Sequence, residues 1–284
     1  MLVTSKDMVL EAYKKRYAVP AINTQGGNYD IIRSICLAAE EMRSPVILAH
    51  YIATGAYSGN EWFAEVAKYW AKKVSVPVAI HLDHGDTFKT CIEALQMGFT
   101  SIMLDCSAAS IEDNIIHTNE VIKVCHALDI PVEAEVGELA RLDAAGTAME
   151  NKNIANVDDV KKFLAGCQPD MLAIGIGNAH GFYKGRPNIR LDILRQVRES
   201  TGLPLVLHGC TGMPDEIVKE AISLGMAKIN FGTLVRHKYL EYYKEGIETL
   251  DHKGHSWKVS QFAELKLREI VKDIIKLSGS ENRF

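Results

Sequence analysis

The sequence predicts an α/β protein that folds as one (β/α)8 TIM barrel domain over residues 1–284, with extra N-terminal and C-terminal helices. Three observations support this fold class. Eight short apolar runs recur along the chain, and their Val, Ile and Leu content is typical of parallel strands buried on both faces. Segments with a 3.6-residue apolar period separate these runs. No linker or change in composition interrupts the alternation, which favours one closed barrel.

The predicted strands are short, and four of the eight begin at a proline, which suits a first strand position whose N–H group is not needed. Their ranges are 17–22, 45–50, 77–82, 100–105, 131–136, 171–176, 204–208 and 227–231. An open, doubly wound sheet is the structural alternative. It usually carries a Gly-x-Gly-x-x-Gly fingerprint after its first strand, whereas residues 23–27 read Asn-Thr-Gln-Gly-Gly.

Helices are expected between the strands, where apolar residues fall on one stripe. Their ranges are 30–43, 62–73, 87–97, 111–128, 157–165, 191–201 and 215–224. Ser110 and Pro214 provide start signals, and Gly98 and Gly225 are among the stop signals. An amphipathic helix precedes the first strand, and two helices are expected within residues 237–277, where they could mediate contacts in an oligomer.

Composition excludes several classes of partner. A net charge of −4, with lysine and arginine spread along the chain, gives no basic patch for nucleic acid. The six cysteines form no CxxC pair and no regular framework, so reduced thiols are expected. No apolar run approaches the roughly 20 residues of a membrane span, and no signal peptide is present. We therefore expect a cytoplasmic protein with no membrane partner.

Polar residues gather where the predicted strands end, which is where barrel enzymes carry their chemistry. His84, His180 and His208 follow three different strands. A single histidine at such a place is more often structural, but three that converge make a site for catalytic Zn²⁺ with room for substrate oxygens. The sequence therefore predicts a zinc site at the mouth of the barrel.

Carboxylates surround the predicted zinc site. Asp83 is adjacent to His84 and is a candidate to shuttle a proton, with the orientation of a histidine as its alternative role. Asp105 and Glu135 are candidates either to orient a histidine or to hold a second cation. For His81 we expect a supporting or packing role.

Gly-rich turns at 177–181 and 209–212 allow backbone N–H groups to approach an anion. Thr211, Asn230 and Thr233 add side-chain donors near the last two strands, which form the common phosphate site of barrel enzymes. The long segment from Gly137 to about Asn156 is expected to be a mobile loop that acts as a lid.

Seven motifs, in this order, resemble those of the class II, zinc-dependent ketose-bisphosphate aldolases, especially the tagatose-bisphosphate branch. They are YAVPAIN, SPVIL, HLDHGD, VEAEVG, GNAHG, LHGCTG and KINFGT. The resemblance runs from about residue 5 to the end of the chain. It implies a carbon–carbon lyase of carbohydrate metabolism that releases dihydroxyacetone phosphate, works as a homodimer or homotetramer, and uses a monovalent cation, Na⁺ or K⁺, besides Zn²⁺.

The resemblance also implies roles for particular residues. His84, His180 and His208 bind Zn²⁺, and Asp83 is the acid/base at the C4 hydroxyl. On the predicted lid, Asp143 stands where the family usually has the Glu that exchanges a proton at C3. The residues expected to bind substrate, mainly its dihydroxyacetone-phosphate half, are Asn23, Gly181, Gly209, Cys210, Thr211, Asn230, Phe231, Gly232 and Thr233.

Departures from the family pattern surround the substrate. Ala140-Arg141 replaces a Gly-Gly pair, Leu234 and then Arg236 follow where an acidic residue is usual, and HGCTG replaces HGASG. Arg141 and Arg236 are therefore candidates to bind the distal anion. The expected substrate is tagatose or fructose 1,6-bisphosphate, and the alternative is 6-sulfofructose 1-phosphate, which would give sulfolactaldehyde.

Three other functions compete with this interpretation. A Schiff-base aldolase needs a lysine at the barrel mouth, but the only strand candidate, Lys228, is expected at the start of its strand and away from the mouth. A metal-dependent hydrolase would carry an HxH pair on the first strand, which here ends in Ala-Ile-Asn. A non-catalytic accessory barrel would not need to keep Asp83 and the three histidines.

Overall fold

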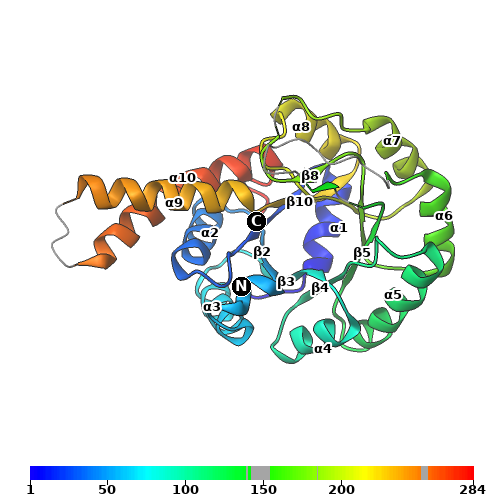
Figure 1. Cartoon of the computed structure of the whole chain (residues 1–284), viewed down its shortest axis with the longest axis horizontal. Coiled ribbons are helices and arrows are strands. Elements are labelled where there is room, and N and C mark those ends of the chain that lie inside the picture. The colour runs from blue at the N-terminus through cyan, green and yellow to red at the C-terminus, as the bar shows by residue number, and fades with distance from the viewer. Residues whose placement is uncertain (139, 142–153, 184, 251–254) are drawn as a thin grey trace.

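The computed structural model describes residues 1–138, 140–141, 154–183, 185–250 and 255–284, and its main feature is a closed parallel barrel (Figure 1). The barrel strands are β1 (Val19–Asn23), β2 (Val46–Tyr51), β3 (Val78–Gly85), β4 (Ser101–Leu104), β5 (Val132–Val136), β7 (Met171–Ile174), β9 (Leu205–Leu207) and β10 (Met226–Phe231). They lie in chain order, and β10 pairs with β1 to close the ring. The predicted (β/α)8 fold is confirmed, and each strand overlaps the range expected for it.

Amphipathic helices cover the outside of the barrel. They are α2 (Tyr29–Glu41), α3 (Asn60–Lys73), α4 (Phe88–Gln96), α5 (Ile111–His126), α6 (Val157–Gly166), α7 (Leu191–Ser200) and α8 (Asp215–Ser223). The Ser110 hydroxyl accepts from the Asp113 N–H at the start of α5, as its position predicts. Gly98 and Gly225 adopt positive φ angles of 87° and 114° just after α4 and α8, where glycine ends a helix at low cost.

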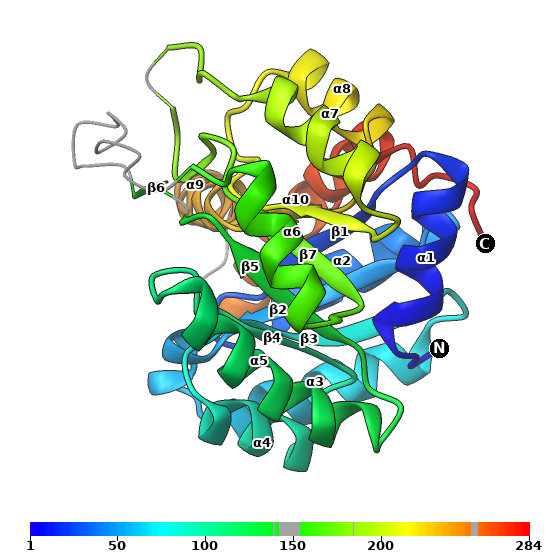
Figure 2. The same cartoon turned by 90° about the vertical axis from the view of Figure 1, so that its right-hand side faces the viewer.

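Helix α1 (Ser5–Lys15) closes the N-terminal end of the barrel. Its Met8, Val9 and Ala12 are buried and pack in one cluster with side chains from β1, β2, β3 and other strands. The Ser5 hydroxyl donates to Ser101 Oγ on β4 at 2.7 Å. Figure 2 shows α1 at one end of the barrel and the short strand β6 (Ala140–Arg141) at the other. Only the C-terminal end of the strands is therefore open for chemistry.

Helices α9 (Thr233–Thr249) and α10 (Ser256–Ser278) form an antiparallel pair that projects beyond the barrel (Figure 1). This confirms the two helices predicted after the last strand. A buried ion pair ties α10 to α2, because Glu264 Oε2 lies 2.5 Å from Arg33 Nη1 and Arg268 Nη2 lies 2.7 Å from Glu264 Oε1. None of the helices in the described part of the chain is long and apolar enough to cross a membrane.

A second, two-stranded sheet was not expected from the sequence. Strand β6 pairs in parallel with β8 (Ala179–His180), with Ala140 opposite Ala179 and Arg141 opposite His180. Strands of two residues are too short to produce an alternating apolar pattern. The pairing places the backbone at the start of the predicted lid directly beside one of the predicted metal ligands.

Candidate active site

The end of β3 carries two neighbouring functional side chains that both face the mouth of the barrel. In a regular strand Asp83 and His84 would point to opposite faces. Here the register with β4 shifts between Leu82 and Gly85, and His84 adopts a left-handed φ of 52°. A bulge of this kind redirects a side chain, and an unfavourable φ at a site is typical of a functional residue.

The structure brings the three predicted histidine ligands together. His84 is the second-last residue of β3, His180 ends β8 and His208 follows β9. The His84 ring centroid lies 4.7 Å from that of His208 and 5.2 Å from that of His180. One nitrogen of each ring lies within 4.8 Å of the others. Imidazoles from three separate elements can thus reach one ion.

The orientation of His84 is set by Asp105, which follows β4. His84 Nδ1 donates to Asp105 Oδ2 at 2.8 Å, so Nε2 is the nitrogen that can bind a metal. This Nε2 is buried and has no hydrogen-bond partner among the described residues. Burial alone would lower the His84 pKa, but the bond to Asp105 and the negative charges of Asp83 and Glu135 outweigh it and raise the pKa to about 9. A metal ion bound to His84 Nε2 would take the place of the second proton, which these negative charges favour on the ring.

The orientation of His208 is set by Glu133 on β5. His208 Nε2 lies 2.9 Å from Glu133 Oε1, and a carboxylate only accepts, so Nε2 carries the proton. His208 Nδ1 then faces Asp83, whose Oδ1 is 3.9 Å away. Burial, followed by the positive charges of His84 and Lys228, holds the His208 pKa well below its ordinary value. A neutral imidazole is the form that binds metal.

These residues fit a divalent metal ion. His84 Nε2 has no hydrogen-bond partner among the described residues, His208 Nδ1 has a long contact of 3.3 Å from Asn230 Nδ2, and His180 supplies a third nitrogen from β8. Three nitrogen ligands with an open position are the usual set for catalytic zinc. His84, Asp105 and Glu135 form a second group of compatible spacing. Since Asp105 is bonded to the other nitrogen of His84, its orienting role is the one that this geometry favours.

Asp83 lies against this histidine cluster and is 7 % exposed. Its Oδ1 accepts from Asn230 Nδ2 at 3.1 Å. Burial alone would raise the Asp83 pKa, but the positive charges nearby, that of His84 first and also that of Lys228, outweigh burial and lower it. Asp83 is therefore an ionised carboxylate that can accept a proton from a substrate bound beside the histidines.

The predicted phosphate-binding turn lies between β9 and α8, next to the start of α9. Gly209 adopts a φ of 70°, and a Cβ at this position would lie 2.3 Å from Ala179 O, so only glycine fits. Thr211 Oγ1 accepts from the Leu234 N–H at 3.2 Å and thus joins the turn to α9. Its hydroxyl oxygen already holds a helix N–H group, which the sequence did not indicate.

Cys210 and Phe231 are less accessible than the other predicted substrate-binding residues. Both are buried, at 2 % and 3 % exposure, and Cys210 Sγ points to Leu207 O at 3.5 Å. Burial raises the pKa of the Cys210 thiol to about 12. A substrate would therefore meet the backbone of these two residues and not their side chains.

The remaining predicted substrate-binding residues lie at the same end of the barrel. Asn23 ends β1, where its Oδ1 accepts from the Gln25 backbone and side chain, each at 2.9 Å. Gly232 and Thr233 begin α9, and a Cβ on Gly232 would lie 3.4 Å from Asn23 Cβ. Gly181 directly follows β8 with a φ of 121°.

The residues predicted to bind the distal anion, Arg141 and Arg236, and the predicted lid residue Asp143 are described to different extents. Arg236 is exposed on the first turn of α9. Arg141 lies in β6 opposite His180 by its backbone. Asp143 lies outside the described residues.

Lys228 corrects one expectation, because it is close to the site and not remote from it. Its side chain is fully buried, and Nζ lies 3.0 Å from Glu133 Oε2 and 2.8 Å from Asn230 Oδ1. Glu133 connects Lys228 to His208, and Asn230 connects it to Asp83. The sequence signal for such a role is a charged residue, Lys228, inside the apolar run of the last strand. The role of Glu133 was missed as well, although its strand carries two glutamates.

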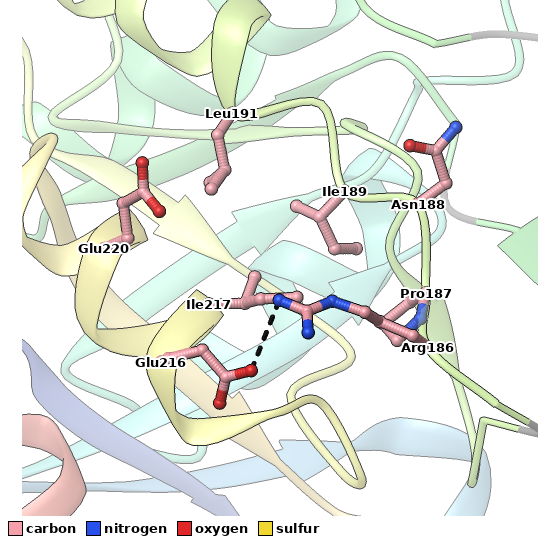
Figure 3. Close-up of a pocket in the computed structure, with 8 residues that line it drawn as sticks. All are labelled: Arg186, Pro187, Asn188, Ile189, Leu191, Glu216, Ile217 and Glu220. Atoms are coloured by element: carbon pink, nitrogen blue, oxygen red, sulfur yellow. Dashed lines mark ion pairs between the residues drawn. The ribbon is translucent and has the colours of Figure 1, made fainter.

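Cavity size does not locate this site. A hollow of about 430 Å³ lies between the segment before α7 and helix α8 (Figure 3). Its lining includes Arg186 and Glu216, whose side chains form an ion pair at 3.3 Å, and it contains none of the three histidines. The candidate site is recognised by its converging histidines and carboxylates, and not by the volume of a cavity.

The sequence model of the class II fructose-bisphosphate aldolase family matches residues 3–283 of this chain. The chain belongs to this family. It is therefore a class II aldolase, a lyase that breaks carbon–carbon bonds, and the resemblance found in the sequence is confirmed. Membership implies a divalent metal ion, typically zinc, and the histidine cluster fits one.

Three relatives show the range of this family around the chain. A D-tagatose-1,6-bisphosphate aldolase subunit, GatY of Klebsiella oxytoca, is 32 % identical over 100 % of this chain and 99 % of its own length. A sulfofructosephosphate aldolase of Alkalicoccus urumqiensis is 33 % identical over 99 % and 98 %. The crystal structure of the YdjI aldolase from Escherichia coli K12 superposes with a TM-score of 0.88 at 30 % identity, covering 100 % of this chain and 99 % of that one.

Proposed function

We propose that this aldolase reversibly cleaves a ketose 1,6-bisphosphate, of tagatose or fructose, to dihydroxyacetone phosphate and an aldehyde, with Zn²⁺ held by His84, His180 and His208. The convergence of the three imidazoles beside the ionised Asp83 is the observation that carries this proposal. We take the chain as one catalytic domain. An accessory, non-catalytic barrel would have no use for this arrangement.

Zn²⁺, when bound, supplies Lewis-acid stabilisation of the negative charge that develops on substrate oxygens as the C3–C4 bond breaks. The carboxylates of Asp105 and Glu133 hold the His84 and His208 rings in the required orientation. A site preorganised in this way loses little energy to rearrangement during the reaction.

Asp83 is the proposed acid/base. Its carboxylate accepts the proton of the C4 hydroxyl during cleavage and returns it during synthesis. The hydrogen bond from Asn230 keeps the carboxylate directed toward the histidine cluster. The positive groups nearby outweigh burial and keep Asp83 ionised, which a general base requires.

The phosphate of the dihydroxyacetone half is proposed to bind at the start of α9. Gly181, the 209–211 turn and residues 231–233 lie at this end of the barrel, and the N-terminal end of a helix favours a negative charge. The Cys210 N–H already donates to Asn230 O, so the other N–H groups of these segments are the proposed donors. Asn23, Asn230 and Thr233 add side-chain polar groups. A monovalent cation near this phosphate is part of the proposal.

A modified substrate is the second candidate. The sulfofructosephosphate aldolase matches the chain as completely as the tagatose-bisphosphate relative does. Arg236, exposed on the first turn of α9, offers a cation for either a terminal phosphate or a sulfonate. We retain 6-sulfofructose 1-phosphate, which would yield sulfolactaldehyde, as the alternative, with Arg141 as a second candidate for the distal anion. A homodimer or homotetramer and a cytoplasmic location stay predictions.

A coupled assay of dihydroxyacetone phosphate release tests the proposal. The panel contains fructose and tagatose 1,6-bisphosphates and 6-sulfofructose 1-phosphate, with and without EDTA. We expect chelation to abolish cleavage, Zn²⁺ to restore it, and Asp83→Asn to lower kcat by about 10²–10⁴-fold with zinc content unchanged. Cleavage that persists in EDTA and is lost on borohydride reduction with substrate would contradict the metal mechanism. Proposed lid chemistry fails if Asp143→Asn leaves C3 proton exchange on dihydroxyacetone phosphate unchanged.

A further inference from the structure

A fully buried ion pair lies inside the barrel beneath the histidine cluster. Lys228 on β10 and Glu133 on β5 are both 0 % exposed, and two strands, β9 and β7, separate β10 from β5 around the ring. The two side chains therefore meet across the interior of the barrel. Burying two charges is costly, and hydrophobic residues at such a place often stabilise a protein as well or better. A role beyond stability accounts better for this pair.

We propose that Lys228 is a positioning residue for both halves of the active site, fixing the metal ligand His208 through Glu133 and the acid/base Asp83 through Asn230. The inference rests on the zinc site of the proposed function. It concerns the residues that orient His208 and Asp83, and not the metal ligands themselves.

The first half acts on His208. Lys228 Nζ donates to Glu133 Oε1 at 3.2 Å and lies within ion-pair distance of Oε2, at 3.0 Å, so the ammonium is held against the carboxylate. The carboxylate in turn accepts from His208 Nε2 at 2.9 Å. This bond fixes the tautomer and the rotation of the ring, and leaves Nδ1 for the metal. Without Lys228, the charge of Glu133 would face only the His81 and His208 rings, whose pKa values burial lowers, and the acceptor would no longer be held.

The second half acts on Asp83. Lys228 Nζ donates to Asn230 Oδ1 at 2.8 Å, and this contact decides which way the amide faces. An ammonium only donates, so the oxygen of Asn230 must point to it. The amide nitrogen then points to Asp83 Oδ1 at 3.1 Å and to His208 Nδ1 at 3.3 Å. One buried cation thus sets the orientation of two groups that face the substrate.

The same contacts exclude Lys228 as a Schiff-base nucleophile. Such a lysine must be uncharged and within reach of a carbonyl carbon. Lys228 forms an ion pair with Glu133, has no exposed surface, and is directed into the barrel. Its effect on catalysis must pass through its neighbours.

The test compares Lys228→Met, the double variant Lys228→Met/Glu133→Gln and the control Arg268→Met. Arg268 pairs with the buried Glu264 on α10, so the control also removes a cation from a buried carboxylate, but outside the barrel. Zinc affinity of each metal-free protein is measured by competition with a chelating dye, alongside its melting temperature and its kcat at saturating Zn²⁺.

We expect both Lys228 variants to bind Zn²⁺ about 10–100-fold more weakly and to lose kcat more than they change KM. The double variant carries no unpaired charge, so it keeps the test valid if Lys228→Met alone does not fold. Arg268→Met should lower the melting temperature and leave zinc affinity unchanged. In the zinc-loaded native protein, side-chain NMR should show His208 bound through Nδ1 with a proton on Nε2.

Zinc affinity and kcat of the double variant within twofold of native would overturn the inference and leave Lys228 a structural role only. Coordination of His208 through Nε2 would also overturn it. If the native protein bound no zinc in the same titration, the proposed metal site itself would fail. That result is distinct from one in which native and variant proteins bind zinc equally.

Discussion

His50, at the end of β2, shows how a single buried side chain couples stability to pH. Its ring is 0 % exposed and stacks on Phe63, with centroids 4.1 Å apart and planes 6° apart. His50 Nε2 lies 2.8 Å from Asn60 Oδ1. Burial lowers the His50 pKa, and the Asn60 contact and the charge of Asp83 offset this only in part. His50 is therefore a neutral packing residue in the folded protein.

The sign of the resulting pH dependence follows from linkage. Histidine in the unfolded chain titrates near a pKa of about 6.5. Because the folded pKa is lower, the unfolded state binds the proton first as the pH falls. Stability is therefore fully present above about pH 6.5 and is lost as the pH falls toward the folded pKa, at no more than about 1.4 kcal/mol per pH unit.

We predict that His50→Gln flattens the acid limb of the stability curve. Urea unfolding of the metal-free enzyme in EDTA, between pH 5 and 7.5 in steps of roughly half a unit, measures it. The slope should decrease without vanishing, since His81 and His208 are also buried with lowered pKa values. His117→Gln, an exposed position on α5, is the control and should leave the slope unchanged. Equal slopes for the native protein and His50→Gln would contradict the assignment.

At the scale of elements, the end of β3 controls where His84 points. Gly85 is the last residue of this strand, and it packs so closely that an added Cβ would lie 2.5 Å from the backbone oxygen of Met103 on β4. The strand must therefore keep a glycine at the position that follows the proposed metal ligand His84. Any side chain there would push β3 away from β4.

We predict that Gly85→Ala weakens zinc binding by about tenfold or more and lowers the free energy of unfolding by about 1–3 kcal/mol. Displacement of β3 moves His84 away from His180 and His208. Gly202→Ala is the matched control, because an added Cβ in that turn meets no atom within 4 Å. Chelator competition and urea unfolding report both quantities. Native zinc affinity in Gly85→Ala would show that the close packing of β3 does not position the ligand.

The sequence predicts whole elements better than local backbone geometry. All eight barrel strands lie near their predicted ranges, since strands buried on both faces are mostly apolar and differ clearly from the amphipathic helices. The register shift that turns His84 toward the mouth was not predicted, because it depends on how β3 and β4 pair. Strands β6 and β8 were missed because they are only two residues long.

For the candidate site, too, the sequence predicts which elements carry the polar side chains but not the contacts between those side chains. Histidines at the ends of separate strands must converge once the barrel closes, so the convergence of His84, His180 and His208 could be inferred from the sequence. Contacts across the interior could not, because no spacing along the chain relates Lys228 to Glu133. The hydrogen bond from Leu234 to Thr211 and the burial of Cys210 likewise depend on the fold.

At the scale of the whole molecule, the two ends of the barrel have different tasks. Helix α1 fills the N-terminal end with apolar side chains. The interior between the ends holds the polar network of His81, Glu133, Lys228 and Asn230. The proposed metal ligands and the proposed acid/base, Asp83, lie above this network at the open end. Stability is concentrated at one end and chemistry at the other, as in other barrels of this type.

The most direct test of the central claim is anomalous diffraction at the zinc edge from crystals of the zinc-loaded protein. We expect one principal peak per chain, bonded to His84 Nε2, His208 Nδ1 and His180 at about 2.0–2.1 Å, with Asp83 beside it and not bonded to it. A principal peak held by Asp105 and Glu135 instead, or rings of the three histidines that share no ion, would contradict the claim.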